Sequence, residues 1–300
     1  MTGVLILDKP ADFTSFDAVA VCRRLCHERK IGHTGTLDPM ATGVLPLLLG
    51  KATRAASLLE DTDKEYEAGF RLGIATDTED STGKVLETSE TPVCREVLES
   101  LLPQFRGEIM QVPPMYSAVS KDGKRLYELA RKGIEVERDA RPVTIFKLEL
   151  TEYDEASREG KLVVSCSKGT YIRTLIADLA KAAGSLGVMT ALRRTKACGF
   201  TLADAVTLDE AKALSEAGTL EERLRPVESL FFHLPAIAVS GAQAVRFQNG
   251  GQLDLKRLPA FRNQKPQDGD TFRVRGENGD FLGLGQVEAE KGWLAILKLF

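Results

Sequence analysis

The sequence has few cysteines, and they do not form the pattern of a disulfide framework or a metal site. Only five occur among its 300 residues, an odd number scattered along the chain. Cys22 and Cys26 lie four residues apart on a predicted helix, where both can face the core, and their spacing to His27 fits no common zinc pattern. We therefore expect reduced thiols, as in a cytosolic protein, and no metal site.

Long apolar runs are also absent. No stretch approaches the length needed to cross a bilayer, and no basic and then apolar leader precedes the strand-like residues 4–7. The composition is otherwise that of an ordinary globular protein, with 43% hydrophobic and 28% charged residues. A chain of this length can form two domains, one large and one small. These properties predict a cytoplasmic protein that does not enter a membrane.

An excess of positive charge is missing as well. The 40 lysines and arginines face 43 aspartates and glutamates, for a net charge of −3, which taken alone argues against a nucleic-acid-binding protein. The distribution is less even: between Lys168 and Lys196, six basic residues face Asp178 alone. A local basic stripe on an acidic body could hold one structured RNA and discourage nonspecific binding. Residues 121–141 are also rich in basic residues, but solvated charged helix faces explain that run equally well.

Hydrophobic periodicity predicts a mixed fold without a regular βα repeat. In the segment 64–72, Tyr66, Phe70 and Leu72 share one face of a strand with a period of two. We expect further strands or extended segments over residues 3–8, 107–119, 142–153 and 162–166, and helices over residues 15–29, 93–102, 171–183 and 208–217. Gly184 is predicted to end the helix before it. This pattern indicates an α+β (mixed α/β) fold on a mainly antiparallel sheet with flanking helices.

The character of the sequence changes near residue 230. Beyond it, short strands predicted over residues 271–275, 280–287 and 293–299 are broken by glycine-rich turns. We therefore predict two domains: residues 1–230, and a small all-β, barrel-like module over residues 231–300.

The segment from Gly32 to Gly43 is the most informative part of the chain. It contains three glycines, which allow positive φ angles and a close approach of the backbone to a ligand. It also holds His33 and a single carboxylate, Asp38, whose backbone is restricted by Pro39. A carboxylate held in this way, without a cluster of metal ligands, suggests covalent or acid–base chemistry. The simpler alternative is that Asp38 caps a following helix.

The wider sequence supports the functional interpretation, because several segments resemble one enzyme family. The block from Lys30 to Leu45, followed by Gly-Lys-Ala-Thr-Arg at residues 50–54, closely resembles the catalytic motif of the TruB family of tRNA pseudouridine synthases. Four further segments match that family in the same order: Lys9-Pro10, Lys64-x-Tyr66, Lys168-Gly-Thr-Tyr-Ile-Arg173 and Leu192-Arg-Arg-Thr195. The resemblance covers essentially the whole chain.

The resemblance implies a function and a set of partners. It implies isomerisation of uridine to pseudouridine at position 55, in the T-loop of tRNA, by a bacterial stand-alone enzyme. The C-terminal module looks like a PUA domain, an RNA-binding fold. The implied partner is tRNA, which would bind through its T-loop and T-stem. The resemblance also implies a monomer that has no obligatory protein partner and does not associate with a membrane. Because the reaction involves no redox change or net hydrolysis, we expect no cofactor and no metal.

The resemblance also assigns catalytic roles. Asp38 would attack C1′ of the ribose, add to C6 of the uracil, or take a proton from C2′, and the sequence does not choose among these routes. Arg173 would keep the carboxylate charged and oriented. Tyr66 would stack on the target uracil and relay a proton, while Tyr171 and Leu192 would line the pocket. Periodicity alone would make these last three core residues.

Further residues are expected to contact the RNA. The target base must leave its stack, and His33 would fill the space that it vacates. Gly35 and Thr36 belong to the same motif and are expected to bind substrate, and Asp80 is expected to join this network. Lys9 would support the active-site loop or contact a phosphate. The segment 121–141 resembles a flexible insertion that closes over the RNA loop.

Two alternatives stay open at this point. One is a guide-RNA-dependent relative that works inside a ribonucleoprotein, although the Pro113–Val119 segment and the insertion after it look like the stand-alone form. The other is a non-catalytic RNA-binding or RNA-folding protein that retains the PUA module. No active-site motif looks degraded, which favours an enzyme.

Overall fold

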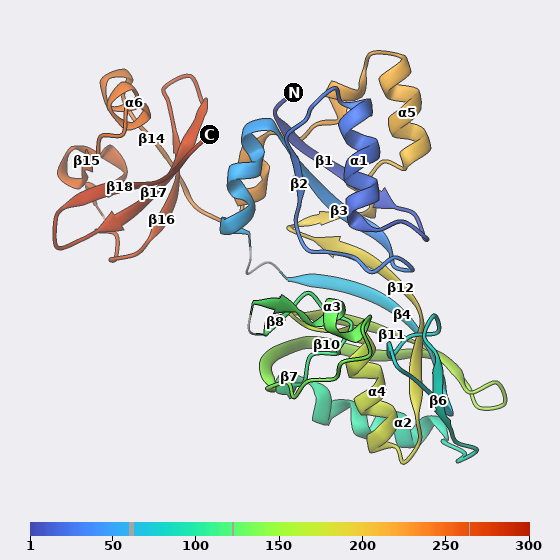
Figure 1. Ribbon diagram of the computed structural model, residues 1–300. Helices are drawn as coiled ribbons and strands as arrows, with labels where there is room; N and C mark the ends of the chain where they lie inside the picture. Colours follow the sequence, from blue (N-terminus) through green and yellow to red (C-terminus); the bar gives the residue numbers. More distant parts are fainter. Residues whose placement is uncertain (60–62, 122, 264) are drawn as a thin grey trace.

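The computed structural model describes residues 1–59, 63–121, 123–263 and 265–300, and it shows two lobes (Figure 1). The larger lobe is built on a nine-stranded sheet and the smaller lobe on a five-stranded sheet. No helix in the described part of the chain is long and apolar enough to cross a bilayer.

The large sheet follows the order β1-β3-β12-β4-β11-β10-β7, with β2 paired to β3 and β13 paired to β12. Its strands are β1 (Gly3–Lys9), β2 (Ile31–His33), β3 (Thr42–Leu49), β4 (Lys64–Leu72), β7 (Gly107–Gln111), β10 (Arg141–Asp154), β11 (Glu159–Cys166), β12 (Gly187–Ala197) and β13 (Phe200–Thr201). All neighbours are antiparallel except β3 and β12, which run parallel over two residue pairs, Thr42 with Arg193 and Gly43 with Arg194. The prediction of a mainly antiparallel sheet with flanking helices is confirmed.

The helices of the larger lobe flank the two halves of this sheet. They are α1 (Ser15–Leu25), α2 (Arg95–Leu101), α3 (Leu126–Ala130), α4 (Ile172–Ala182) and α5 (Leu208–Glu216), with 3₁₀ segments η1 (Gly50–Leu58), η2 (Leu102–Phe105), η3 (Leu202–Asp204), η4 (Leu220–Arg223) and η5 (Val227–Phe231). In Figure 1, α1 and α5 lie beside β1 to β3, whereas α2 and α4 lie beside the β10 and β11 half. Two small hairpins complete the lobe: β5 (Ile74–Thr76) with β6 (Val85–Thr88), and β8 (Ser120–Lys121) with β9 (Lys124–Arg125).

One apolar core spans both halves of the sheet. On β4, the alternating residues Tyr66, Ala68, Phe70 and Leu72 are buried, as their period of two predicts. They share a cluster with residues of α1, β1 and β3 and with the apolar face of α4. Burial of each large side chain contributes about 1.5–3 kcal/mol. The loops that connect these strands are therefore anchored to a single packed core.

Two predicted segments extend well beyond the observed elements, and one predicted helix end was confirmed. The helix expected over residues 15–29 ends at Leu25, because His27 adopts a left-handed backbone with φ 48°. The extended segment expected over residues 107–119 is a strand only as far as Gln111, since the following prolines have no N–H to donate. Gly184 does end α4, with φ 74°, and the two hydrogen bonds across the helix end form a Schellman motif.

The described part of the smaller lobe, residues 231–263 and 265–300, contains one α-helix and two short 3₁₀ segments besides its strands. Its elements are β14 (Ala236–Ala238), α6 (Gly241–Gln248), β15 (Leu253–Asp254), η6 (Leu255–Arg257), η7 (Pro259–Phe261), β16 (Thr271–Arg275), β17 (Phe281–Glu288) and β18 (Trp293–Leu299). The sheet runs in the order β14-β16-β17-β18-β15. Three predicted strands are found with bounds that differ by at most one residue, whereas α6 was not predicted.

The smaller lobe packs directly on the larger one. The rings of Phe281 and Phe300 stack at 5.6 Å and contact Phe231 of η5, and Leu284 shares a core cluster with residues of β1 and β3. Arg273 and Arg275 both donate to Glu228, at 3.0 and 2.6 Å. The contact between the lobes is therefore partly apolar and partly an ion-pair network.

Candidate active site

Asp38 lies on the loop that joins β2 to β3, and hydrogen bonds on both sides hold this loop. Before it, the Leu37 N–H donates to Ser15 Oγ at 2.9 Å, and this hydroxyl donates back to the Leu37 carbonyl at 3.2 Å. After it, Lys9 Nζ donates to the Pro39 carbonyl at 3.2 Å. The backbone around the carboxylate is thus tied to the start of α1 and to the end of β1.

Lys9 contacts the Asp38 loop from the interior of the protein. Its side chain is completely buried, and Nζ also donates to the carbonyls of Pro10 and Phe13, at 2.8 and 2.6 Å. Burial lowers the pKa of this lysine to about 8, although the negative charge of Asp38 opposes that change. Of the two roles expected for Lys9, the structure therefore favours support of the loop over contact with a phosphate.

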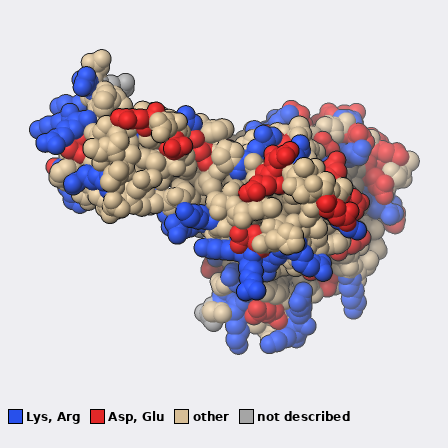
Figure 2. All heavy atoms as spheres, turned by 90° about the horizontal axis from the view of Figure 1, so that it is seen from above, with Lys and Arg blue, Asp and Glu red and all other residues tan. Residues whose placement is uncertain are grey.

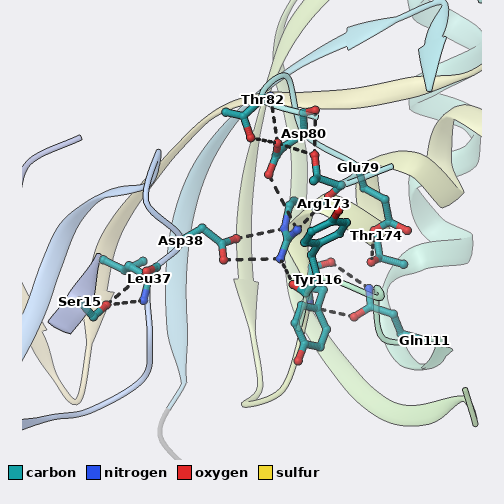
Figure 3. A network of polar contacts seen from close by, with 12 residues as sticks. Ser15, Leu37, Asp38, Glu79, Asp80, Thr82, Gln111, Tyr116, Arg173 and Thr174 are labelled. Carbon is teal, nitrogen blue, oxygen red and sulfur yellow. Dashed lines mark hydrogen bonds and ion pairs between the residues drawn. The ribbon is translucent and has the colours of Figure 1, made fainter. Parts of the chain in front are cut away.

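Arg173, the second residue of α4, meets the Asp38 carboxylate with two nitrogens (Figure 3). Nε lies 3.0 Å from Oδ2, and Nη2 donates to Oδ1 at 3.5 Å. The arginine side chain is 5% exposed, whereas 35% of the Asp38 side chain remains exposed. This contact fixes the orientation of the carboxylate and leaves part of it open to a ligand.

The guanidinium of Arg173 also contacts two backbone carbonyls and a second carboxylate. Nη1 donates to the Thr78 carbonyl at 2.8 Å, and Nη2 donates to the Tyr116 carbonyl at 3.1 Å. Asp80 Oδ2 lies 3.8 Å from Nη1. The guanidinium is therefore fixed by the turn after β5 and by the segment after β7, as well as by Asp38.

Asp80 is buried and accepts hydrogen bonds from its own turn. Thr78 Oγ1 donates to Oδ1 at 2.8 Å, and the Thr82 N–H and hydroxyl donate to the same oxygen at 3.0 and 2.6 Å. Three donors and a nearby guanidinium thus compensate this buried carboxylate. The structure places Asp80 beside Arg173, whereas its expected role in contacting the RNA stays a prediction.

Electrostatics at Asp38 reflect two opposing effects. Burial raises the pKa of the carboxyl group, and the charge of Asp80 adds to this rise, whereas Arg173 and Lys9 lower it. The pKa lies above its ordinary value, so the guanidinium limits the effect of burial without reversing it. Burial raises the pKa of Tyr66 and of Tyr171, and the charge of Asp38 adds a smaller contribution to both.

The other predicted pocket residues come from three elements. Tyr66 lies on β4 and is buried, and Leu192 on β12 is buried opposite Ala68. Tyr171 immediately precedes α4, and Gln111 holds its backbone by two hydrogen bonds of 2.7 and 3.0 Å. A cavity of about 250 Å³ adjoins this tyrosine. It is lined by Gln111, Pro113, Val119, Arg141, Pro142, Val143, Lys168, Gly169 and Tyr171.

His33 lies at the end of β2, at the entrance to the Asp38 loop. The ring of Phe16 meets it edge-on, with centroids 6.0 Å apart. Burial lowers the pKa of His33, and the charge of Arg194 lowers it further, so the neutral ring prevails near pH 7. The next loop residues, Gly35 and Thr36, are exposed. The segment that precedes Asp38 in the sequence thus contains a partly buried, neutral aromatic ring and two exposed residues.

The segment 121–141 contains little regular structure. It holds the end of β8, the strand β9 and the short helix α3, and residue 122 lies outside the described residues. Arg138 Nη1 donates to the Pro113 carbonyl at 3.1 Å, which ties the segment to the turn after β7. Closure of this segment over a ligand stays a prediction.

Sequence reasoning missed several residues that build the site. Glu79 has a left-handed backbone with φ 62° and accepts from the Thr174 hydroxyl at 2.5 Å, and burial raises the pKa of its carboxyl group. Ser15 and Gln111 each make two hydrogen bonds to backbone that is distant in the sequence, at Leu37 and Tyr171. No local pattern marks such residues, since Glu79 is one polar residue among the several between Thr76 and Gly83.

The surface charge is unevenly distributed. Figure 2 shows lysine and arginine side chains projecting together along one edge of the larger lobe, whereas aspartates and glutamates gather on other parts of the same view. A polyanion would therefore meet basic side chains on part of a molecule whose net charge is −3.

Comparison with protein-family models matches nearly the whole chain. Residues 23–172 match the TruB family pseudouridylate synthase N-terminal domain, and residues 173–231 match the tRNA pseudouridylate synthase B C-terminal domain. Residues 235–292 match a model described as pseudouridine synthase II TruB, C-terminal.

Curated proteins and solved structures agree with these models. The chain is 46% identical to tRNA pseudouridine synthase B of Azoarcus sp. (strain BH72), covering 96% of this chain and 91% of that protein. It is 44% identical to tRNA pseudouridine synthase B of Stutzerimonas stutzeri (strain A1501), covering 100% and 95%. Among solved structures, a chain of a Cbf5-Nop10-Gar1 complex matches with a TM-score of 0.75 and 26% identity, over 100% of this chain and 84% of that one.

Proposed function

Because the chain belongs to the TruB family of pseudouridylate synthases, we propose that it isomerises uridine to pseudouridine in tRNA, at position 55 of the T-loop. The observation that supports this most directly is the two-nitrogen contact of Arg173 with the partly exposed carboxylate of Asp38. The curated relatives described above are named tRNA pseudouridine synthase B.

The reaction itself explains the type of residue in the site. The bond between N1 and C1′ breaks, the uracil turns, and a bond forms between C5 and C1′. The hydrogen on C5 leaves as a proton, and N1 gains a proton. Since no electrons are gained or lost overall and no bond is hydrolysed in the net reaction, acid–base and nucleophilic side chains suffice. The function therefore requires no cofactor or metal.

Asp38 carries the chemistry in this proposal. Its exposed oxygen faces the sugar or the base of a bound nucleotide and attacks C1′, adds to C6, or takes a proton from C2′. All three routes need the ionised carboxylate. Arg173 opposes the pKa rise that burial causes and fixes the direction of the oxygens.

The two tyrosines near Asp38 complete the pocket. Tyr66 stacks on the target uracil and relays a proton through its phenol, and Tyr171 and Leu192 line the pocket. Their support is the effect of the Asp38 charge on the pKa of both phenols and the position of Leu192 on the strand next to Tyr66.

The surrounding surface binds the RNA. The neutral ring of His33 takes the place of the extruded base, and Gly35 and Thr36 contact the nucleotide through exposed backbone and hydroxyl groups. The segment 121–141 closes over the T-loop, and the module over residues 231–300 acts as a PUA-like RNA-binding domain beside the catalytic domain of residues 1–230. The protein works as a monomer in the cytoplasm, without an obligatory protein partner.

Tritium release tests this function. The purified chain is incubated with an unmodified tRNA transcript that carries [5-³H]uridine, and release of tritium to water is measured. We expect one equivalent of tritium per tRNA, and none from a transcript with cytidine at position 55. Asp38→Asn should lower the rate by at least about a thousandfold and leave tRNA affinity within threefold. Tritium release from the cytidine-55 transcript would contradict the site assignment.

The same assay separates the alternatives. A guide-RNA-dependent enzyme would release no tritium until a guide and partner proteins were added, and a non-catalytic RNA-binding protein would bind the transcript without releasing any. The guide-dependent alternative is not favoured, since identity to the named tRNA enzymes is well above the 26% identity to the Cbf5 complex chain.

A further inference from the structure

Arg194 is a completely buried arginine on β12 that the mechanism above does not use. In the parallel pairing of β12 with β3 its partner is Gly43, and in the antiparallel pairing with β4 its partner is Tyr66. Arg194 therefore lies where the strand that follows the Asp38 loop meets the strand that carries Tyr66.

Its guanidinium joins this junction to the glycine-rich loop. Nε donates to the Val44 carbonyl at 2.7 Å, and Nη2 donates to the Gly35 carbonyl at 3.1 Å. These two acceptors lie on either side of Asp38 in the sequence. A planar fork with donors in fixed directions can hold both at once, whereas a lysine ammonium cannot reproduce that geometry.

The loop passes directly over this guanidinium. Gly35 has φ 67°, and a Cβ placed on it would lie 3.3 Å from Arg194 Nη1 and 3.2 Å from Lys64 Cε. On the other side, a Cβ on Gly43 would lie 2.2 Å from the Arg194 carbonyl oxygen. Both glycines permit the close approach of the loop and of β3 to this one residue.

The charge of Arg194 is not compensated by an acid. Across residues 1–59, 63–121, 123–263 and 265–300, no carboxylate lies within ion-pair distance of it. Burial lowers the pKa of Lys9, His33 and Lys64, and the charge of Arg194 adds a smaller contribution in the same direction. The same charge lowers the pKa of Tyr66 against the larger effect of burial. A buried cation among other cations is costly to fold, so stability alone does not account for an arginine at this position.

We propose that Arg194 is a positioning residue of the active site, which holds the Asp38 loop at a fixed separation from Tyr66 through its two carbonyl contacts. The carboxylate and the phenol then face the same nucleotide. This inference rests on the proposed function, because it assigns Tyr66 and Asp38 to one reaction. Misplacement of reacting groups by about 1 Å can slow a reaction about a hundredfold.

The test compares two substitutions with a matched control. Arg194→Gln removes the charge and the fork, and Arg194→Lys keeps the charge without the fork. Arg106→Gln is the control, because Arg106 also donates from Nε and Nη2 to a carbonyl, that of Leu148, in a part of the sheet away from the loop. The single-turnover rate and the Kd for tRNA are measured for each variant, and thermal melting verifies that each is folded.

We expect both Arg194 variants to slow the single-turnover step at least about a hundredfold, with Kd changed less than threefold, and the control to match the wild type. The inference is overturned if Arg194→Lys restores the rate, since charge and not the fork would then matter. It is also overturned if Kd weakens in parallel with the rate. Should the glutamine variant fail to fold, the lysine variant carries the same test.

A second measurement does not depend on activity. The chain has three histidines, so the titration of His33 can be followed by NMR. Arg194→Gln should raise the pKa of His33, because a positive charge beside it is removed, and Arg194→Lys should change it less. An unchanged His33 titration in the glutamine variant would mean that Arg194 does not act on this loop. If the wild type shows this coupling but converts no tRNA, the proposed function fails while the contact stands.

Discussion

Two buried arginines flank the Asp38 loop, and their surroundings differ. Arg173 faces the carboxylates of Asp38 and Asp80 as well as two backbone carbonyls. Arg194 donates to the carbonyls of Val44 and Gly35. After burial, its charge also contributes to the lowered pKa of two lysines and of His33. The first arginine therefore sets the ionisation and direction of a reactive group, whereas the second sets the position of the backbone that carries it.

The strongest way to separate these roles is Arg173→Gln. It leaves Asp38 and Asp80 without their common cation, so the pKa of Asp38 should rise further under burial and the remaining like charge. We expect activity to fall at least about a thousandfold and the free energy of unfolding to fall by about 2–3 kcal/mol, allowing for the exposure of Asp38. Single-turnover kinetics and urea denaturation measure these changes. An unchanged unfolding free energy would contradict the assignment of a charge-compensating role.

A smaller effect is expected from Asp80→Asn. The amide removes one negative charge near Arg173 and cannot accept all three hydrogen bonds from Thr78 and Thr82 in the same way. The arginine should lose part of its orientation, and the rate should fall about tenfold to a hundredfold. Asp77→Asn, in the same turn, is the control, and equal rates for the two variants would argue against the network.

Gly35→Ala tests the backbone side of the comparison. The alanine must adopt φ 67° and place its Cβ within about 3.3 Å of Arg194 Nη1 and Lys64 Cε. We expect a loss of about 1–2 kcal/mol in unfolding free energy and a rate about tenfold lower. Gly218→Ala isolates the backbone cost, because Gly218 has φ 73° with nothing within 4 Å of an added Cβ. Equal losses of stability and activity in both variants would show that contact with Arg194 is unimportant.

The smallest effect concerns the pH dependence of stability at His33. Burial and then the charge of Arg194 lower its pKa below the ordinary value of 6.5. The unfolded chain therefore binds more protons at this residue. As the pH falls below 6.5, protonation of His33 in the unfolded chain lowers the free energy of unfolding, and this loss continues until the pH reaches the folded-state pKa. Urea denaturation between pH 5 and 7.5 should show a steeper loss in the wild type than in His33→Gln. Identical slopes would contradict the prediction.

Local sequence patterns were sufficient for most of the elements, and they also indicated Asp38 as a candidate. The alternation from Tyr66 to Leu72 predicted β4 and its buried face, and the glycine after α4 predicted its end. The density of glycine around a single acid indicated Asp38, and the family resemblance then supplied its partner Arg173. These features depend on short segments whose physical properties can be read directly from residue types.

Contacts between distant segments could not be predicted in this way. Lys9 supports the loop because its ammonium group donates to three carbonyls. One of these, at Pro39, lies 30 residues away in the sequence, so no local pattern predicts the contact. The place of Arg194 depends on a parallel pairing of only two residue pairs between β3 and β12. The end of α1 depends on a left-handed residue, His27, that helical periodicity does not reveal.

The short parallel pairing between β3 and β12 has a consequence for how the chain folds. Asp38 and Arg173 are separated by 135 positions, and Arg194 and Val44 by 150, so these contacts close long loops and form only after both halves of the sheet exist. Recovery of activity during refolding should accordingly coincide with the last kinetic phase. A chain halted short of that phase would show most of its circular-dichroism signal and none of its turnover.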